Sequence, residues 1–297
     1  MTVGVLGLGK MGSRIALKLS KSGHRVIAWN RGPKDISGLE ISKNIENLIS
    51  KLPRPKVLWL MLPAGEATQG VLDQLEPYLE KGDIVVDGGN AYFKDTERRF
   101  GHFKPMGIEY LGIGISGGIL AEGSGYPLMA GGSKEAYEYI IPLLDSLAKP
   151  KGGHKFFGEG GAGHFIKMAH NGIEYGMMQS LAEGFEVLEK SDYKFDLVKV
   201  AEVFQKGTVI SGFLMDRLAE SLKNSPDLKM MEGPVSESGE ARWTIEEAKN
   251  KGINIRIIED SLRYRLQTQK QKELHRAFST KVLNALRNAF GGHEIGK

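Results

Sequence analysis

Four polar side chains whose types suit proton transfer recur at helical spacing in the middle of the chain. They are Lys167, His170, Asn171 and Glu174. On an α-helix this spacing of i, i+3, i+4 and i+7 places them on one face, with Tyr175 at its border. Apolar side chains fill the positions around this stripe, which indicates the lining of a cavity. The alternative interpretation is an ordinary helix face in contact with solvent.

The lysine and the glutamate of the stripe suit acid–base chemistry. A lysine becomes a general base when partial burial or neighbouring cations lower its pKa. Lys167 could then accept a proton from an alcohol while hydride leaves the same carbon. A carboxylic acid that stays protonated, at Glu174, could deliver a proton elsewhere on the substrate.

A glycine-rich turn near the start of the chain predicts a cofactor site for the hydride. Gly7, Gly9 and Gly12 follow an apolar run at residues 3–6 and open a predicted helix. The first glycine permits the tight turn, the second lets the backbone approach a pyrophosphate, and the third lets helix and strand pack closely. The helix N-terminus then faces the diphosphate. The predicted contacts are Gly7, Leu8, Gly9, Lys10, Met11 and Gly12; the alternative is a purely structural glycine turn.

The second predicted strand, at residues 25–29, is followed by Asn30 and Arg31. A site that prefers NAD usually has Asp or Glu here to accept hydrogen bonds from the ribose 2′-hydroxyl. No acid stands here to repel a 2′-phosphate, and a guanidinium can pair with that phosphate bidentately. The sequence therefore favours NADP, with NAD possible, unless Arg31 is a surface arginine that leaves the selectivity loose.

Three irregular segments follow later predicted strands. They are residues 62–65 (LPAG), 87–90 (DGGN) and 116–118 (SGG). Ligands of doubly wound sheets bind at the carboxyl ends of the strands, and glycine permits close approach of the backbone there. Each segment alone could be an ordinary turn, but three at one sheet edge favour a binding site.

Strand-like and helical segments alternate over the first half of the chain. Continuous apolar runs, typical of strands covered on both faces, occur at residues 3–6, 25–29, 57–62, 84–86, 110–115 and 126–130. Helical segments, for example 11–21 and 66–78, lie between several of them. This alternation predicts an α/β domain with a doubly wound, mostly parallel sheet of Rossmann type.

Long segments with a 3.6-residue period replace this alternation after a glycine-rich stretch at 158–163. They cover residues 164–191, 197–206, 212–224, 244–252 and 258–289. The sequence thus predicts a dinucleotide-binding Rossmann domain at 1–160. An all-helical C-terminal domain for substrate binding and dimerisation, with a C-terminal tail, is predicted at 161–297.

The composition excludes several classes of protein. The chain has no cysteine, so disulfides, thiolate nucleophiles and Cys-ligated metal sites are excluded. A net charge of +4 suits small anionic substrates and is weak evidence for nucleic acid. The most apolar run, at 57–63, is too short to span a bilayer, and the N-terminus lacks the pattern of a signal peptide. We therefore expect a cytoplasmic protein without nucleic-acid or membrane partners.

The combination of GLGKMG, DGGN, SGG and GHFIKMAHNGIEY resembles the 6-phosphogluconate dehydrogenase family, as do SGEARWT and LRNAFGGH. The resemblance runs from residue 2 to residue 293, and the length is similar to that of the short form, which lacks the duplicated helical half of longer enzymes. It implies oxidative decarboxylation of 6-phospho-D-gluconate to ribulose 5-phosphate in the pentose phosphate pathway, with NADP or NAD and no metal. By motif, Lys167 would be the general base at the C3 hydroxyl, and Glu174 the acid that protonates C1.

The resemblance also implies a set of ligand contacts. The substrate carboxylate and hydroxyls would contact Asn90, Ser116, Gly117, Gly118, His170 and Asn171. The substrate phosphate would contact Tyr175, Arg242 and Arg265, where Arg242 stands in place of a lysine in many long-form members. Independently of the resemblance, the ends of the predicted strands predict cofactor contacts at Asn30, Arg31, Leu62, Pro63, Ala64 and Asn90. Arg287 and His293 match tail residues that reach into the partner subunit's site, which implies a homodimer or homotetramer.

Two other functions stay open at this point. A hydroxyisobutyrate-type β-hydroxyacid dehydrogenase shares the Rossmann domain and a lysine on the equivalent helix, but its small substrate has no use for a phosphate-binding set. A non-catalytic NADP-binding sensor would bind the cofactor without turnover, and the pair of Lys167 and Glu174 argues against it.

Overall fold

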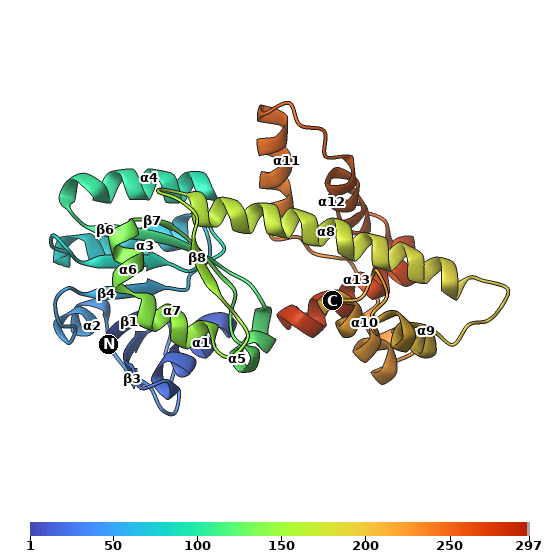
Figure 1. Ribbon diagram of the computed structural model, residues 1–297, viewed down its shortest axis with the longest axis horizontal. Helices are drawn as coiled ribbons and strands as arrows, with labels where there is room; N and C mark the ends of the chain where they lie inside the picture. The colour runs from blue at the N-terminus through green and yellow to red at the C-terminus, as the bar shows by residue number, and fades with distance from the viewer. Residues whose placement is uncertain (296–297) are drawn as a thin grey trace. The chain divides into compact units, whose positions relative to one another are not determined.

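The computed structural model describes residues 1–295 and divides into two compact units. The division falls between Met168 and Ala169, inside the long helix α8 (Ala162–Glu189), which Figure 1 labels. The domain boundary that the sequence places between residues 160 and 161 stays a prediction. Among the described residues, no helix combines the length and the apolar character that crossing a membrane requires.

The first unit is built on one sheet. Within residues 1–168 it has eight strands in the order β3-β2-β1-β4-β5-β6-β7-β8, and each neighbouring pair is parallel except β6 and β7. The strands are β1 (Thr2–Leu6), β2 (Arg25–Trp29), β3 (Glu40–Ile41), β4 (Val57–Leu60), β5 (Ile84–Asp87), β6 (Glu109–Ile115), β7 (Leu128–Gly132) and β8 (His154–Phe156). The winding direction reverses between β1 and β4, the switch point at which such sheets bind ligands. The predicted doubly wound sheet is confirmed.

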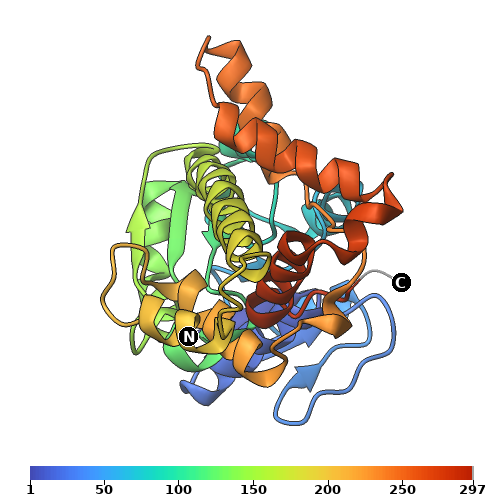
Figure 2. The ribbon, with the colours of Figure 1, turned by 90° about the vertical axis from the view of Figure 1, so that its right-hand side faces the viewer.

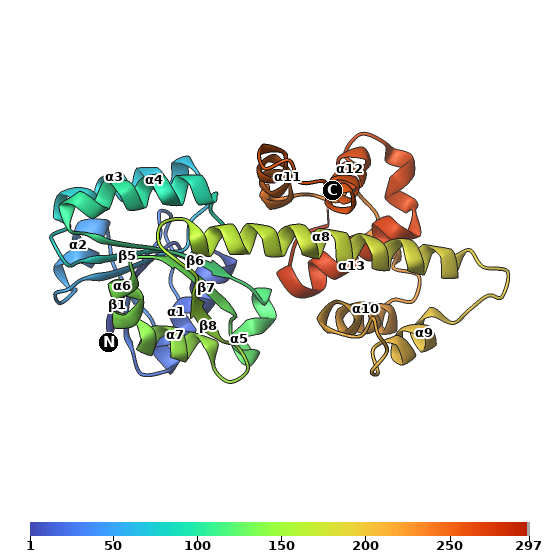
Figure 3. The same ribbon diagram turned by 45° about the horizontal axis from the view of Figure 1, so that its top comes forward.

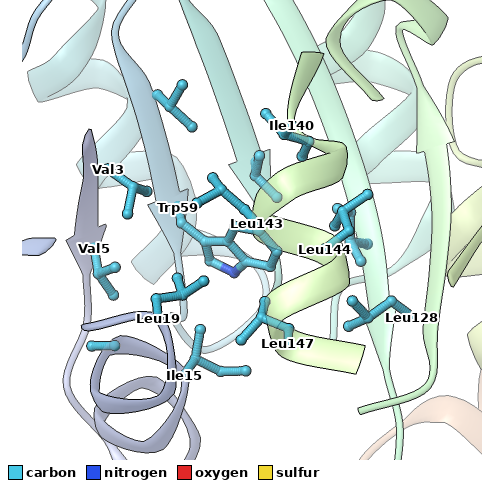
Figure 4. Close-up of a cluster of buried hydrophobic side chains, with 14 of the residues drawn as sticks. Val3, Val5, Ile15, Leu19, Trp59, Leu128, Ile140, Leu143, Leu144 and Leu147 are labelled. Atoms are coloured by element: carbon cyan, nitrogen blue, oxygen red, sulfur yellow. The ribbon is translucent and has the colours of Figure 1, made fainter. Parts of the chain in front are cut away.

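Helices cover both faces of this sheet, as Figure 3 shows. They are α1 (Lys10–Lys21), α2 (Ile45–Ser50), α3 (Glu66–Leu75), α4 (Phe93–Phe103), α5 (Ala121–Ser124), α6 (Lys134–Tyr139) and α7 (Ile141–Ala148). Trp59 of β4 packs on one face against α1 and α7 (Figure 4), whereas Leu58 and Leu60 pack on the other against α2 and α3. Both faces of β4 are therefore buried, which explains its uninterrupted apolar run.

Two strands were not predicted from the sequence, and both lie at the edges of the sheet. β3 has two residues, Glu40 and Ile41, and β8 has the sequence HKF, in which no apolar alternation is visible. An edge strand has one neighbour and one exposed side, so its sequence need not be apolar. The strand predicted at 57–62 ends at Leu60, and the one predicted at 126–130 begins at Leu128.

The second unit consists of helices and their connections, so the predicted all-helical C-terminal part is confirmed over the described residues. After α8 come α9 (Leu197–Phe204), α10 (Phe213–Asn224), α11 (Glu240–Asn250), α12 (Arg256–Thr268) and α13 (Phe278–Gly291). α8, α9, α10 and α13 share one apolar core. α11 and α12 lie side by side (Figure 2) and pack on α8 through a smaller cluster around Tyr175 and Leu262.

The prediction of one continuous helical segment over residues 258–289 is wrong. Two helices, α12 and α13, are separated by a short 3-10 helix at Lys272–Arg276. The connecting segment is polar, and the ring of His275 lies 2.8 Å from the carbonyl oxygen of Thr268 at the end of α12. α11 begins at Glu240 rather than at 244, which brings Glu240 into its first turn.

Candidate active site

The glycine turn between β1 and α1 has a geometry that suits a bound diphosphate. Gly7 has a φ of 97°, and a Cβ on Gly12 would lie 1.9 Å from the carbonyl oxygen of Gly7, so both positions require glycine. A Cβ on Gly9 would meet no described protein atom within 4 Å. The first turn of α1 has no acidic residue, and no side chain caps Gly9 among the described residues. The N-terminus of α1 can therefore accept an anion.

Asn30 holds this glycine turn in place from the end of β2. Its Oδ1 accepts a hydrogen bond of 3.0 Å from the backbone N–H of Leu8, and its Nδ2 donates to the carbonyl of Gly32. The ammonium of Lys34 donates to the carbonyl of Leu8, and Arg31 is exposed. Lys34 thus adds a second cation beside the turn. Lys34 was not predicted from the sequence, because no motif marks this loop.

The loops that follow β4 and β5 lie against each other. A Cβ on Gly89 would lie 2.6 Å from the carbonyl oxygen of Leu62, so only glycine permits this approach. Thr68 Oγ1 donates to the carbonyl of Pro63 at 2.8 Å and holds the first loop. Ala64 and Asn90 are exposed. The structure therefore brings the predicted contacts of residues 62–64 close to those of residues 89–90.

The loop after β6 reverses direction through two left-handed glycines. Gly117 has a φ of 93° and Gly118 a φ of 58°, conformations that an L side chain rarely adopts. The N–H of Ser116 donates to the carbonyl of Pro127 at 3.0 Å, which fixes the entry to the turn. All three predicted residues are half-buried.

The first turn of α8 lies directly on glycines of β6. A Cβ on Gly114 would lie 2.4 Å from Cβ of Lys167, and a Cβ on Gly112 would lie 2.8 Å from Nδ1 of His164. Close approach of a helix to a strand requires glycine at such positions. Gly114 therefore determines how near the stem of Lys167 comes to the carboxyl end of β6.

A buried polar network anchors this turn of α8 to the sheet. Nδ1 of His164 lies 2.7 Å from Oγ1 of Thr96 on α4. Asp87, at the end of β5, accepts hydrogen bonds of 3.2 Å from Arg99 and from the hydroxyl of Tyr110. Burial lowers the pKa of His164, against the opposing charge of Asp87. These contacts were not predicted from the sequence, because the residues that make them lie on four separate elements.

In the second unit, α8 carries the rest of the polar stripe. Nδ1 of His170 lies 2.9 Å from Oδ1 of Asn171 and 3.9 Å from a carboxylate oxygen of Glu174. Asn171 is buried, whereas His170 and Glu174 are partly exposed. Ile173 and Met177 are 59% and 55% exposed, so not every apolar neighbour of the stripe faces the core.

One buried arginine contacts Tyr175, and a second interacts with it electrostatically. Cζ of Arg265 lies 3.4 Å from the centroid of the Tyr175 ring, and Arg287 is 7% exposed. Burial, together with the charge of Arg287, lowers the pKa of Arg265 to about 10, although Tyr175 opposes this shift. Burial also lowers the pKa of Arg287. Two desolvated cations at one place form a site that a bound anion would stabilise.

Arg242 and His293 lie in more exposed positions. Nη2 of Arg242 donates to Glu237 at 2.7 Å, and the other carboxylate oxygen of Glu237 accepts from the N–H of Gly239. The N–H of Ser238 donates to the hydroxyl of Tyr175 at 3.3 Å, which ties this segment to the arginine cluster. His293 follows α13, and its ring centroid lies 6.4 Å from that of Phe290.

A hollow of about 580 Å³ lies elsewhere, at the β8 edge of the first unit. Tyr137, Asp145 and His154 are among its lining residues, and no residue predicted for the active site belongs to it. Within residues 1–295, no group of three or more His, Cys, Asp and Glu side chains could hold a metal ion.

Comparison with known proteins matches both parts of the chain. Residues 2–160 match the family model of the NAD binding domain of 6-phosphogluconate dehydrogenase, and residues 163–289 match that of its C-terminal domain. The chain belongs to the 6-phosphogluconate dehydrogenase family.

Relatives in this family cover the whole chain. A putative 6-phosphogluconate dehydrogenase of Bacillus subtilis is 39% identical over 304 residues, with 100% of both chains covered. An NAD(+)-dependent, decarboxylating 6-phosphogluconate dehydrogenase of Haloferax volcanii is 35% identical, covering 100% of this chain and 99% of its own. The 6-phosphogluconate dehydrogenase of Plasmodium falciparum, solved with NADP+ and with 6-phosphogluconate, has a TM-score of 0.78 at 28% identity. It is longer, and the match covers 90% of this chain and 62% of that one.

Within this family member, the structure groups the predicted residues by unit. The first unit holds the glycine turn, Asn30, the three loops and Lys167; the second holds His170, Asn171, Glu174, Tyr175 and the arginines. Glu240 is a contact that the sequence analysis missed: its carboxylate lies 2.9 Å from Nδ2 of Asn171. Glu240 lies in the motif SGEARWT, two residues before Arg242, and this position could have marked it as a site residue.

Proposed function

We propose that the chain catalyses the oxidative decarboxylation of 6-phospho-D-gluconate to D-ribulose 5-phosphate and carbon dioxide, with NADP or NAD as hydride acceptor. The observation that carries the proposal is the pair of buried guanidinium groups, Arg265 and Arg287, around Tyr175. The charges of Glu174 and Glu240 oppose only part of the effect of burial on these two arginines, and a dianionic phosphate would supply further counter-charge. The names of the relatives support the same substrate.

The residues of the glycine turn fit a dinucleotide, because α1 presents an uncapped N-terminus beside Gly9. When bound, the nicotinamide ring accepts a hydride. Arg31 and Lys34, with Asn30 in place of an acid, support NADP as the preferred cofactor. The name of the Haloferax relative specifies NAD(+), so NAD is the alternative for this chain.

Lys167 acts as the general base of the oxidation. Its amine takes the proton of the C3 hydroxyl while the hydride leaves C3, so the alcohol becomes a ketone. The C1–C2 bond of this 3-keto acid then breaks and releases carbon dioxide. Its electron pair forms the C2–C3 double bond of the enediol, and the π electrons of the C3 carbonyl move to the C3 oxygen. The Lys167 ammonium returns its proton to that oxygen and so stabilises the developing charge.

Glu174 acts as the acid that completes the reaction. Its protonated carboxyl group donates a proton to the former C2, which becomes C1 of the pentulose, while the Lys167 amine takes back the hydroxyl proton of the enediol and the ketone re-forms. His170 and Asn171, on the same face of α8, bind substrate hydroxyls, together with Asn90, Ser116, Gly117 and Gly118. Arg242, Arg265 and Tyr175 bind the phosphate.

We also propose a homodimer or homotetramer in the cytoplasm. Large apolar side chains of the second unit, such as Val187, Met230 and Ile257, are 72%, 78% and 68% exposed, which supports a subunit interface there. Arg287 interacts electrostatically with Tyr175 of its own chain. His293, which is exposed, is the tail residue that we propose to complete the partner's site.

Initial-rate kinetics of the purified protein test the proposal. The expected result is turnover of 6-phosphogluconate with release of carbon dioxide, and much weaker turnover of gluconate and of 3-hydroxyisobutyrate. Equal or better rates with 3-hydroxyisobutyrate would instead indicate a β-hydroxyacid dehydrogenase. Cofactor binding without turnover of any of these substrates would indicate a sensor.

A further inference from the structure

A buried carboxylate lies against the polar stripe of α8 in the second unit. Glu240, in the first turn of α11, is 2% exposed. Its Oε1 accepts a hydrogen bond of 2.9 Å from Nδ2 of Asn171, which is 9% exposed. Asn171 in turn contacts Nδ1 of His170 at 2.9 Å through Oδ1. The three side chains form a chain from the interior to the partly exposed histidine.

Glycine on α8 makes this contact possible. A Cβ on Gly172 would lie 2.9 Å from Cγ2 of Thr244, one turn further along α11. The hydroxyl of Thr244 donates to the backbone carbonyl of Glu240 at 2.8 Å. The two helices therefore approach closely enough for a side chain from α11 to reach Asn171.

The chemistry of the three groups determines the direction of each hydrogen bond. In the structure the NH₂ group of Asn171 donates to Oε1 of Glu240, which is the orientation that an ionised carboxylate, an acceptor only, requires. Its carbonyl oxygen then faces His170 and can only accept. The proton of a neutral His170 must consequently sit on Nδ1, which leaves Nε2 as the acceptor of the ring.

We infer that Glu240 is a positioning residue that fixes the rotamer of Asn171 and, through it, the tautomer of His170. In this tautomer the ring accepts a hydrogen bond from a sugar hydroxyl through Nε2. This last step rests on the proposed function, whereas the tautomer does not.

The tautomer is measurable on the full-length protein by two-bond ¹H–¹⁵N correlation spectra of the histidine rings. Comparison with His170→Gln identifies the signals of His170. We expect the Nδ1–H form in the wild type when the ring is neutral. An Nε2–H form there would overturn the inference, and this holds even if no Glu240 variant folds.

Two substitutions then test the role of Glu240. Glu240→Leu removes the acceptor and frees Asn171 to turn, so His170 should shift toward the Nε2–H form and kcat/KM for 6-phosphogluconate should fall about 10- to 100-fold, the size of one hydrogen bond to a charged group. Glu240→Gln keeps an acceptor of the same shape and should retain the Nδ1–H form. An unchanged tautomer in a folded Glu240→Leu would contradict the inference.

A matched control lies on the same helix. Glu247 pairs with Lys251 at 3.1 Å, and Glu247→Leu should change neither the His170 signals nor the kinetics. If the wild type does not oxidise 6-phosphogluconate, the proposed function fails, while the spectra still decide the role of Glu240.

Discussion

The guanidinium of Arg265 stacks on the ring of Tyr175, with Cζ 3.4 Å from the ring centroid. Arg265 is 2% exposed, and its Nε has no hydrogen-bond partner within residues 1–295. Desolvation of this kind destabilises a cation unless an anion is near. For this reason we propose that the substrate phosphate binds at this pair.

Replacement of Arg265 by lysine tests whether phosphate binding needs the planar guanidinium group or only its positive charge. A lysine side chain at this position would keep the positive charge but would neither stack on the ring nor bind a phosphate bidentately. For Arg265→Lys we expect KM for 6-phosphogluconate to rise about tenfold or more, the effect of one charged hydrogen bond. Arg263→Lys, on the same helix but 65% exposed, is the control and should behave as the wild type. Equal KM values in the two variants would remove Arg265 from the phosphate site.

Lys167→Met tests the general base. Methionine keeps the apolar stem that lies on Gly114 but cannot take a proton, so hydride transfer should slow by about 10²–10⁴-fold. Cofactor binding, measured by fluorescence titration, should persist because the glycine turn is unchanged. Lys190→Met, at the exposed residue that follows the end of the same helix, is the control for the loss of a lysine. Near-normal turnover of Lys167→Met would assign the base to another group.

His164 should make the protein sensitive to acid. Burial lowers its pKa from the ordinary value of 6.5, so below that pH the unfolded chain binds a proton that the folded chain resists. The contribution of neutral His164 is therefore complete above pH 6.5 and is lost as the pH falls through and below this value. Urea unfolding from pH 5 to 8 should show this slope, and His164→Gln should flatten it. His102→Gln, on the surface of α4, serves as the control; the same slope in both variants would contradict the assignment.

Asn30→Asp tests the cofactor preference. A carboxylate can still accept the hydrogen bond from Leu8, so the glycine turn should keep its shape. Its charge would repel a 2′-phosphate, and the ratio of kcat/KM for NADP to that for NAD should fall about tenfold or more. Lys34→Gln should shift this ratio in the same direction, because Lys34 contacts the turn. A wild type that strongly prefers NAD would overturn our interpretation of Asn30 and Arg31.

Mixed oligomers distinguish the roles of the two tail residues. A Lys167→Met chain is mixed with a chain that carries either His293→Ala or Arg287→Gln. If the tail residue acts in the partner's site, mixing restores activity. In each mixed dimer both substitutions then fall in one site, and the other site is intact. We expect restoration for His293→Ala and none for Arg287→Gln, since Arg287 lies beside Tyr175 of its own chain. Restoration with Arg287→Gln would show that Arg287 also crosses over.

Local pattern was sufficient to predict the nucleotide-binding turn and the polar stripe. Gly7 and Gly12 stand where only glycine fits, and Gly9 leaves open space beside the turn. Lys167 to Glu174 follow the period of one helix. Both features depend on residues close together in the sequence. The break between α12 and α13 was missed because a polar connecting segment can imitate a solvated helix face.

The sequence by itself determined the alternation of strands and helices in the first half, the helical character of the second half, the family, and the residue types that we propose for the chemistry. The tertiary structure decided which distant residues contact them. Gly114 packs against Lys167, Thr96 lies within hydrogen-bond distance of His164, Glu240 accepts a hydrogen bond from Asn171, and Arg265 stacks on Tyr175. These pairs come from elements far apart in the chain. Their contacts depend on how strands and helices pack, and no spacing along the sequence encodes that packing directly.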